Sequence, residues 1–217
     1  MKGRIFLACA LALSAAAGCT DTTTRAATSP DDATGWPFSS PLAEALPSLA
    51  APDPDEFRGM SVQSLLDGST AHIAIQPEGR RVRIADASGC VSTRPLDWFA
   101  PSDSFDGCGT SRDWQDATAE VRVLDSLYPL TIGATGRYWR RAVSTATGEV
   151  STRETDCAVV DAVAVALPRR GRTPAYVVRC DDGRIERTTW YTPGLGPIAY
   201  REAHASKGLR DAWMRAD

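Results

Sequence analysis

Histidine and lysine are scarce in this chain of 217 residues. His72 and His204 are the only histidines, and Lys207 is the only lysine after Lys2. A hydrolase needs a nucleophile held beside an oriented base, and few groups here can act as that base. The sequence also lacks a G-x-S-x-G elbow, an H-E-x-x-H helix and a P-loop. We therefore expect a protein that is not an enzyme.

Long apolar runs are also missing, except at the start of the chain. Lys2 and Arg4 precede a stretch of small and apolar residues, 5–17, which is typical of a secretory signal peptide. As a helix this stretch would rise about 20 Å, which is short of a hydrocarbon core of about 30 Å. We expect residues 1–18 to be a cleaved leader and not a membrane span.

The residues around the expected cut resemble the lipobox of bacterial lipoproteins. Ala16-Ala17-Gly18 places small residues before Cys19, which would become the lipidated N-terminus. Plain cleavage after Ala17 is the alternative, and it would leave Cys19 as a free thiol, a liability in an oxidising compartment. We therefore expect palmitate and diacylglycerol on Cys19. Thr20, where retained enterobacterial lipoproteins carry Asp, favours the outer membrane, with the domain in the periplasm or at the cell surface.

Composition divides the rest of the chain in two. Residues 19–53 are mostly Thr, Ala, Ser, Asp and Pro, which cannot bury enough surface to offset the entropy of ordering. We expect them to be a flexible tether, followed by a single domain over residues 54–217. Without Lys2 and Arg4 the chain has 22 basic residues against 27 acidic ones, a net charge of −5. This balance argues against a nucleic-acid partner.

Four cysteines remain after Cys19, namely Cys90, Cys108, Cys157 and Cys180. An even number in an exported chain is typical of a disulfide framework, and four cysteines allow three pairings. Cys157 and Cys180 fall in consecutive predicted strands, which would bring them near each other if a bulge or offset adjusts the register. Cys90 and Cys108 then pair. C-x-x-C spacing is absent, so we expect neither a metal nor a cofactor.

The domain is predicted to be mainly β. Alternating residues predict strands over 71–76, 80–85, 118–124, 136–143, 156–166, 175–180, 185–192 and 196–202. Asp182-Gly183 predicts a hairpin turn. A capping pattern at Asp53, followed by apolar residues at helical spacing, predicts a short helix that ends at Gly68. A second short helix is predicted over 206–215. We expect an antiparallel curved sheet or half-barrel with a short helix at each end.

Several motifs give a family resemblance over residues 55–202. They are Leu127-Tyr128-Pro129-Leu130 with Gly133, Trp190-Tyr191-Thr192-Pro193-Gly194-Leu195-Gly196, and the segments around Cys90, Trp98-Phe99-Ala100-Pro101, Cys108, Cys157 and Cys180. The chain resembles uncharacterised proteobacterial outer-membrane lipoproteins with a half-barrel, lipoprotein-carrier-like domain. The resemblance implies a concave sheet face that can hold acyl chains, and it implies no reaction.

Candidate ligand residues are few. Trp98, Trp139 and Trp190 could line a groove for a hydrophobic ligand, with core packing as the alternative. His72 is expected on a sheet face and His204 near an exposed end of the domain. The leading hypothesis is a non-catalytic envelope lipoprotein that binds a hydrophobic or envelope component, or an envelope protein. An envelope hydrolase with an unrecognised site and a purely structural protein are the alternatives.

Overall fold

The computed structural model describes residues 39–42, 44–52, 54–108 and 111–217. In these ranges the chain is mainly β, as predicted, with two 3-10 helices, η1 (Pro54–Glu56) and η2 (Arg112–Trp114), and no α-helix. The strands are β1 (Ser39–Pro41), β2 (Met60–Ser64), β3 (Thr70–Glu78), β4 (Arg81–Ala85), β5 (Val91–Pro95), β6 (Ser104–Asp106), β7 (Ala117–Asp125), β8 (Thr135–Ser144), β9 (Val150–Leu167), β10 (Gly171–Asp181), β11 (Ile185–Thr192), β12 (Gly196–His204) and β13 (Gly208–Arg215).

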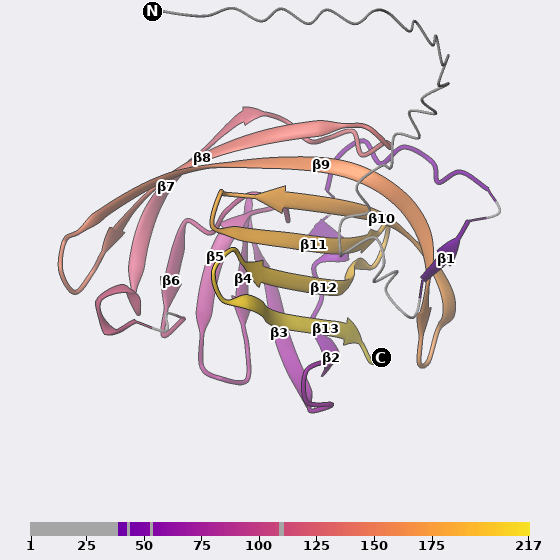
Figure 1. The fold of residues 1–217 in the computed structure, drawn as a ribbon, viewed down its shortest axis with the longest axis horizontal. Helices are drawn as coiled ribbons and strands as arrows, with labels where there is room; N and C mark the ends of the chain where they lie inside the picture. Colours follow the sequence, from indigo (N-terminus) through magenta and orange to yellow (C-terminus); the bar gives the residue numbers. More distant parts are fainter. Residues whose placement is uncertain (1–38, 43, 53, 109–110) are drawn as a thin grey trace, which may run out of the picture. The chain divides into compact units, whose positions relative to one another are not determined.

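Twelve of these strands close into an antiparallel barrel (Figure 1). Each strand from β2 to β13 pairs with the next one in the sequence, and β13 returns to β2, where Trp213 lies opposite Ser64. The long strand β9 pairs with β8 along 150–158 and with β1 along 163–165. Closure pairs the backbone groups that a half-barrel would leave open along two edges. The predicted antiparallel curved sheet is therefore confirmed, whereas the half-barrel is replaced by a closed barrel.

All eight predicted strands correspond to observed ones, with bounds that differ by a few residues. The predicted turn at Asp182-Gly183 joins β10 to β11. Gly183 has a φ of 79°, a conformation that a residue without a Cβ adopts freely. The Asp182 side chain accepts hydrogen bonds from the N–H groups of Arg184 and Ile185, at 3.0 and 2.9 Å. Sequence-local chemistry thus fixes this hairpin.

Both expected disulfides are present. Cys157 and Cys180 lie directly opposite each other on β9 and β10, with their Cα atoms 4.0 Å apart. Cys90 and Cys108 are joined with a Cα separation of 4.4 Å. The sequence predicted that a bulge or offset must adjust the register of these two strands. A bulge at Val177/Val178 provides this shift in the pairing of β10 with β9.

The two predicted helices are wrong. In the segment 53–68, only Pro54–Glu56 forms a single 3-10 turn, and Met60–Ser64 is strand β2. Residues 206–215 contain β13 in place of a helix. Both segments contain apolar residues at alternate positions, and pairing with neighbours on both sides outweighs the helical spacing of a few side chains. The barrel closes through these two strands, so tertiary pairing decides their conformation.

Part of the segment that we assigned to the tether is attached to the sheet. Ser39–Pro41 pairs with β9, and Leu49 forms an isolated bridge with Leu130. Leu46 and Leu49 pack against the barrel core, and the Tyr176 hydroxyl donates a hydrogen bond to the Pro47 carbonyl. Ordered structure therefore begins before residue 54. The expected leader and Cys19 lie outside the described residues.

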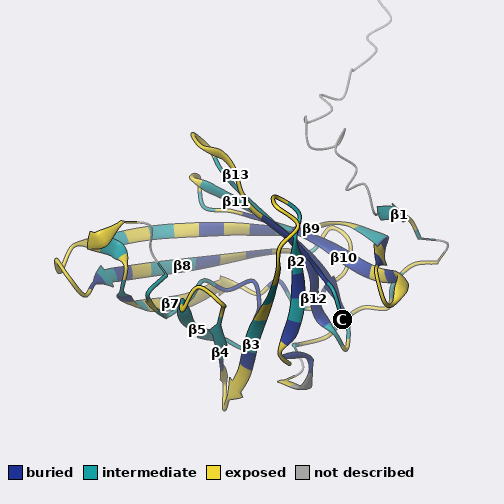
Figure 2. Cartoon of the chain, turned by 90° about the horizontal axis from the view of Figure 1, so that it is seen from below, coloured by how far each residue is buried: buried dark blue, intermediate teal, exposed yellow. Residues whose placement is uncertain are grey.

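The inner face of the barrel carries a large apolar cluster. Because side chains alternate across a strand, buried and exposed residues alternate along β8 and β9 (Figure 2). We call the buried residues of this face the inner apolar cluster. They are Phe57, Met60, Val62, Ile75, Val82, Trp98, Phe99, Ala100, Leu127, Leu130, Tyr138, Cys157, Val159, Tyr176, Val178, Cys180, Tyr191 and Trp213.

A loop between β5 and β6, residues 96–103, contributes to this cluster, and we call it the inner loop. Trp98 stacks on Phe57 with ring centres 6.2 Å apart. Asp97 accepts hydrogen bonds from the Tyr138 hydroxyl at 2.6 Å and from the Phe99 N–H at 2.9 Å. Because these bonds satisfy the Asp97 carboxylate, the loop can enter the core without leaving it unpaired.

The buried carboxylate of Glu56 fixes η1 in the same way. It accepts hydrogen bonds from the Tyr191 hydroxyl at 2.6 Å and from the Gly194 N–H at 2.7 Å. Phe57, the next residue, is only 1% exposed. This single 3-10 turn therefore positions Phe57 in the inner apolar cluster.

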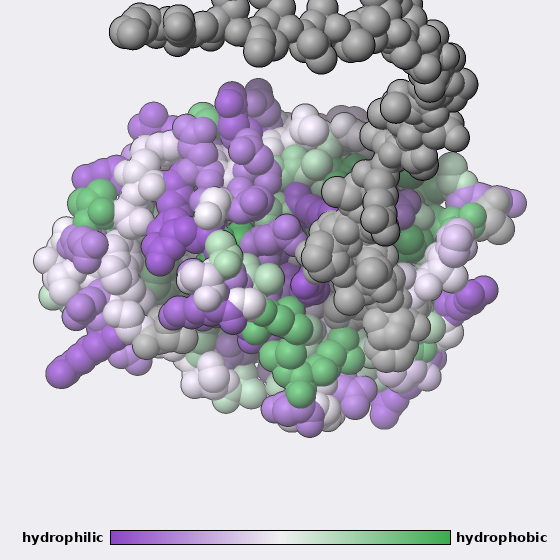
Figure 3. Space-filling view, in the orientation of Figure 1, coloured by the Kyte–Doolittle hydropathy of each residue, from purple (hydrophilic) through white to green (hydrophobic). Residues whose placement is uncertain are grey.

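A second apolar cluster lies on the opposite face of β9 to β13. Its buried members are Val165, Leu167, Ala175, Val177, Trp190, Ile198, Ala199, Ala212 and Met214. The face drawn in Figure 3 shows a hydrophobic patch in the region of β13 and β2, with hydrophilic side chains gathered toward the β8 side. Among the described residues, no helix has the length and apolar character needed to cross a membrane.

Candidate anion-binding site

Arginine side chains continue the inner face of the barrel where the inner apolar cluster ends. On β8, Tyr138 belongs to that cluster and Arg140 follows two residues later, on the same face. Arg153 is the cross-strand neighbour of Arg140 on β9. On β11, Arg187 lies opposite Cys180. Register alone therefore points three arginines toward the interior.

Arg94 is the fourth inward arginine, since it lies opposite buried Val82. Its Nη1 donates to the Trp98 carbonyl oxygen at 2.9 Å, and its guanidinium carbon lies 5.0 Å from the centre of the Trp98 ring. Its Nε is buried and has no hydrogen-bond partner in the described part of the chain. Arg94 thus holds the inner loop and keeps an unused donor. We call these four residues the interior arginine cluster.

Arg140 also holds the inner loop but uses only one donor. Its Nε donates to the Ser102 carbonyl oxygen at 3.0 Å, and its guanidinium lies 5.3 Å from the Phe105 ring centre. Its neighbour Arg153 makes no hydrogen bond or ion pair with any residue that the structure describes. Like charges directly opposite each other on neighbouring strands are destabilising. Arg140 and Arg153 are thus two like charges on neighbouring strands, and neither forms an ion pair with a described carboxylate.

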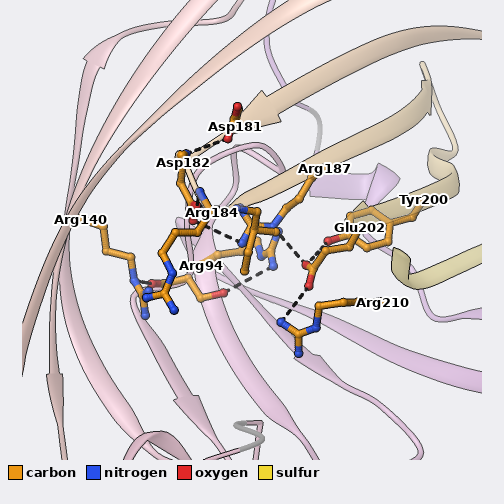
Figure 4. Close-up of polar contacts among 12 residues, drawn as sticks. Arg94, Arg140, Asp181, Asp182, Arg184, Arg187, Tyr200, Glu202 and Arg210 are labelled. Carbon is orange, nitrogen blue, oxygen red and sulfur yellow. Dashed lines mark hydrogen bonds and ion pairs between the residues drawn. The ribbon is translucent and has the colours of Figure 1, made fainter. Parts of the chain in front are cut away.

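Arg187 differs, because carboxylates surround it (Figure 4). Its Nε donates to Glu202 Oε2 at 3.3 Å, and its Nη2 lies 3.9 Å from Asp182 Oδ2. Glu202 also accepts a hydrogen bond from the Tyr200 hydroxyl at 2.8 Å and forms an ion pair with Arg210 at 3.7 Å. The Arg187 side chain remains 34% exposed. Water therefore reaches this part of the interior.

The pKa values reflect this unequal distribution of charge. Burial lowers the pKa of Arg140 to about 10, and the charges of Arg187 and Arg153 add to the effect. Burial also lowers the pKa of Arg94. Burial acts in the same direction on Arg187, but Tyr200, Glu202 and Asp182 outweigh it and raise its pKa. Asp182 acts on both arginines, but at Arg140 its effect is outweighed by burial and by the neighbouring positive charges, which a bound anion would offset.

The three tryptophans proposed as a groove are not brought together. Trp98 is buried in the inner apolar cluster, and Trp190 is buried in the cluster on the opposite face. Trp139 points outward from β8, where the Arg122 guanidinium lies 4.8 Å from its ring centre. Core packing, the alternative that we weighed, describes Trp98 and Trp190. The arginine cluster was not predicted, although arginines at inward positions of predicted strands were the available signal.

The two histidines lie on different strands, β3 and β12. His72 is exposed on β3, opposite Ser61, and a Cβ at Gly59 would lie 3.2 Å from its Nε2. His204 Nδ1 accepts a hydrogen bond from the Ser206 N–H at 3.1 Å. Across the described ranges, no three His, Cys, Asp or Glu side chains gather as metal ligands.

A separate groove of about 440 Å³ lies on the outer face of β8 to β11. Its charged residues come from one cross-strand row and the row beside it, and they are Asp125, Arg137, Asp156, Arg179, Asp181 and Glu186. Acidic and basic groups alternate only in part of this row. The groove has no aromatic lining, which distinguishes it from the interior site.

Comparisons with known proteins supply no relative: no family model, curated protein or solved structure matches this chain. The function must therefore be argued from the geometry of the barrel and its arginines.

Proposed function

We propose that this protein is a non-catalytic lipoprotein of the cell envelope, anchored through Cys19, that binds an anionic envelope component on the interior arginine cluster. The observation that carries the proposal is the opposed pair Arg140 and Arg153, which face the interior and form no ion pair with a carboxylate of the described residues. Retaining such a pair costs stability unless a bound anion neutralises it. The leader pattern before Cys19 supports export.

The surrounding residues support binding rather than chemistry. Arg94 and Arg140 are held by backbone carbonyls of Trp98 and Ser102, so their guanidinium groups are positioned before any ligand arrives. Preorganised donors reduce the entropy lost on binding. Phe105 and Trp98 supply aromatic surface beside the charges. Such a site fits a ligand with an anionic head and a less polar remainder.

Anion binding can be tested on the full chain in a non-ionic detergent. Titration calorimetry with sulfate, succinate and glycerol 3-phosphate should detect binding of at least one of these probes. The double variant Arg140→Gln with Arg153→Gln should weaken that binding by more than tenfold. Arg141→Gln is the matched control, because Arg141 is the next residue on β8 and is exposed. Equal binding by both variants, or no binding of any probe, would contradict the proposal.

The anchor is tested separately. Growth with a palmitate analogue should label the wild-type chain and leave Cys19→Ala unlabelled. A label that persists in Cys19→Ala would overturn the anchor and leave the anion site untouched.

A further inference from the structure

We infer that the anion bound by the interior arginine cluster is a phosphate monoester. This inference rests on the proposed anion-binding function and names the ligand class of that site. It follows from three features of the described residues: the two opposed charges of Arg140 and Arg153, the placement of the donors around them, and the lack of an ion pair between either of these two arginines and a described carboxylate.

The charge fits a dianion. Among the described residues, Glu202 and Asp182 form ion pairs with Arg187 and none with Arg140 or Arg153, so Asp182 compensates Arg140 only from a distance. These two guanidinium groups carry two positive charges. A phosphate monoester carries about −1.5 to −2 at pH 7. A phosphodiester or a single carboxylate carries only −1 and would leave one arginine uncompensated.

The donors fit a group with three terminal oxygens. Cross-strand neighbours place their Cβ atoms about 4.5–5.5 Å apart, so one group between Arg140 and Arg153 can meet both guanidinium forks. Arg94 presents a buried Nε without a partner among the described residues, and Arg94 and Arg187 both lie near enough to influence Arg140 electrostatically. A carboxylate has two oxygens, which one guanidinium satisfies in a bidentate pair. A monoester has three and can accept from several arginines.

Two sources share this chemistry, namely the head group of a lipid and a soluble phosphorylated molecule. The site does not distinguish them by charge, because both present the same terminal phosphate. The test therefore includes one probe of each kind and a diester lipid that differs only in the charge and substitution of its phosphate.

The experiment uses the full chain in detergent micelles with four probes: glycerol 3-phosphate, phosphatidic acid, phosphatidylglycerol and succinate. We expect glycerol 3-phosphate or phosphatidic acid to bind at least tenfold more tightly than phosphatidylglycerol and succinate. Binding of both monoesters indicates that the phosphate suffices, and binding of phosphatidic acid alone indicates a lipid source. Succinate or phosphatidylglycerol binding as tightly as the monoesters would overturn the phosphate class while the proposed anion-binding function stands.

Variants locate the site. Arg153→Gln should weaken monoester binding at least tenfold, and Arg141→Gln should leave it unchanged. Arg153→Lys keeps the charge but loses the planar fork, so an intermediate loss is expected. Near-ultraviolet circular dichroism checks whether Arg153→Gln folds. If it does not fold, Arg153→Lys replaces it in the binding measurement. Monoester binding that is unaffected in both Arg153 variants would overturn the assignment.

Discussion

The two halves of the barrel interior are built from the same strands but from opposite chemistry. On β8, Tyr138 lies in the inner apolar cluster, and Arg140 lies two residues away on the same face. In the apolar half, the buried carboxylates of Asp97 and Glu56 both receive hydrogen bonds from tyrosine hydroxyls. In the arginine half, the buried Nε of Arg94 has no hydrogen-bond partner among the described residues. The difference is the one expected if, as we propose, one half stabilises the fold and the other binds a ligand.

This contrast predicts that substitutions in the two halves affect different properties of the protein. Replacing residues of the apolar half should cost stability without a specific effect on anions. Replacing Arg153, the member of the arginine cluster that bonds to no other described residue, should cost anion binding with little effect on stability. The following predictions test this division.

Tyr138→Ala should give the largest effect. The ring is fully buried, and its loss leaves a cavity and removes the donor to Asp97. We expect the free energy of unfolding to fall by about 3–5 kcal/mol in a urea titration. Arg141→Ala, three residues along on the outer face, should change it by less than about 0.5 kcal/mol. A loss for Tyr138→Ala below about 1 kcal/mol would contradict the packed interior.

Removing the disulfide Cys157–Cys180 should cost slightly less. Its sequence separation is 23 residues, for which loop-closure entropy gives about 3 kcal/mol. Cys90–Cys108 closes 18 residues and should give nearly the same entropic loss. The double alanine variant at 157 and 180 should nevertheless be the less stable one, because both of these sulfurs belong to the inner apolar cluster. The opposite order in thermal denaturation would refute this difference.

Tyr191→Phe removes the hydroxyl that donates to buried Glu56. A hydrogen bond to a charged group contributes about 1.5–3 kcal/mol, so the variant should lose that much stability. Tyr200→Phe is the comparison in the arginine half, where Glu202 keeps Arg187 and Arg210 as partners. Its loss should be smaller, about 0.5–1.5 kcal/mol. Equal losses in the two variants would remove the distinction between the halves.

The pH dependence of stability should show the buried state of Asp97. Burial raises its pKa in the folded protein above the ordinary value of 3.8, although hydrogen bonds from Tyr138 and Phe99 oppose the shift. Between these two pKa values the folded state binds more protons, so stability falls as the pH rises through the window. Asp97→Asn should lose this component. An identical slope for both proteins, measured by urea titrations at several pH values, would show that Asp97 does not titrate as inferred.

Arg153→Met should give the smallest change in stability. The arginine has no bonded partner among the described residues, so an apolar side chain of similar length should be neutral or stabilising, within about 1 kcal/mol. Thermal denaturation without added anion measures this directly. A loss of more than about 2 kcal/mol would mean that Arg153 stabilises the fold.

The fold was largely predictable because strand alternation is a local signal. The strands containing Cys157 and Cys180 were recognised from it, and their pairing followed from the chain order. Strands β2 and β13 are not predicted by this signal, because they pair with each other across about 150 residues of sequence. In both segments, the helical spacing of a few apolar residues is a stronger local signal than the alternation of a strand, so the sequence predicts a helix. The conformation of both segments is set by the strands that pair with them.

The candidate site was harder to predict, since it depends on register. The inward position of Arg94 is defined only by its pairing with Val82, and that of Arg153 by its pairing with Arg140. The tryptophans misled for the same reason, since Trp98 and Trp190 lie on opposite faces of the sheet. The residue type alone predicts a common groove. The sheet geometry shows that the two tryptophans belong to different clusters.

An experimental structure of the full chain with glycerol 3-phosphate provides the decisive test of the interior arginine cluster. It should show the phosphate between Arg140 and Arg153, with its terminal oxygens within hydrogen-bond distance of both guanidinium groups. A structure with the phosphate absent from the interior at saturating concentration, and with Arg140 and Arg153 paired to carboxylates of the protein, would contradict it.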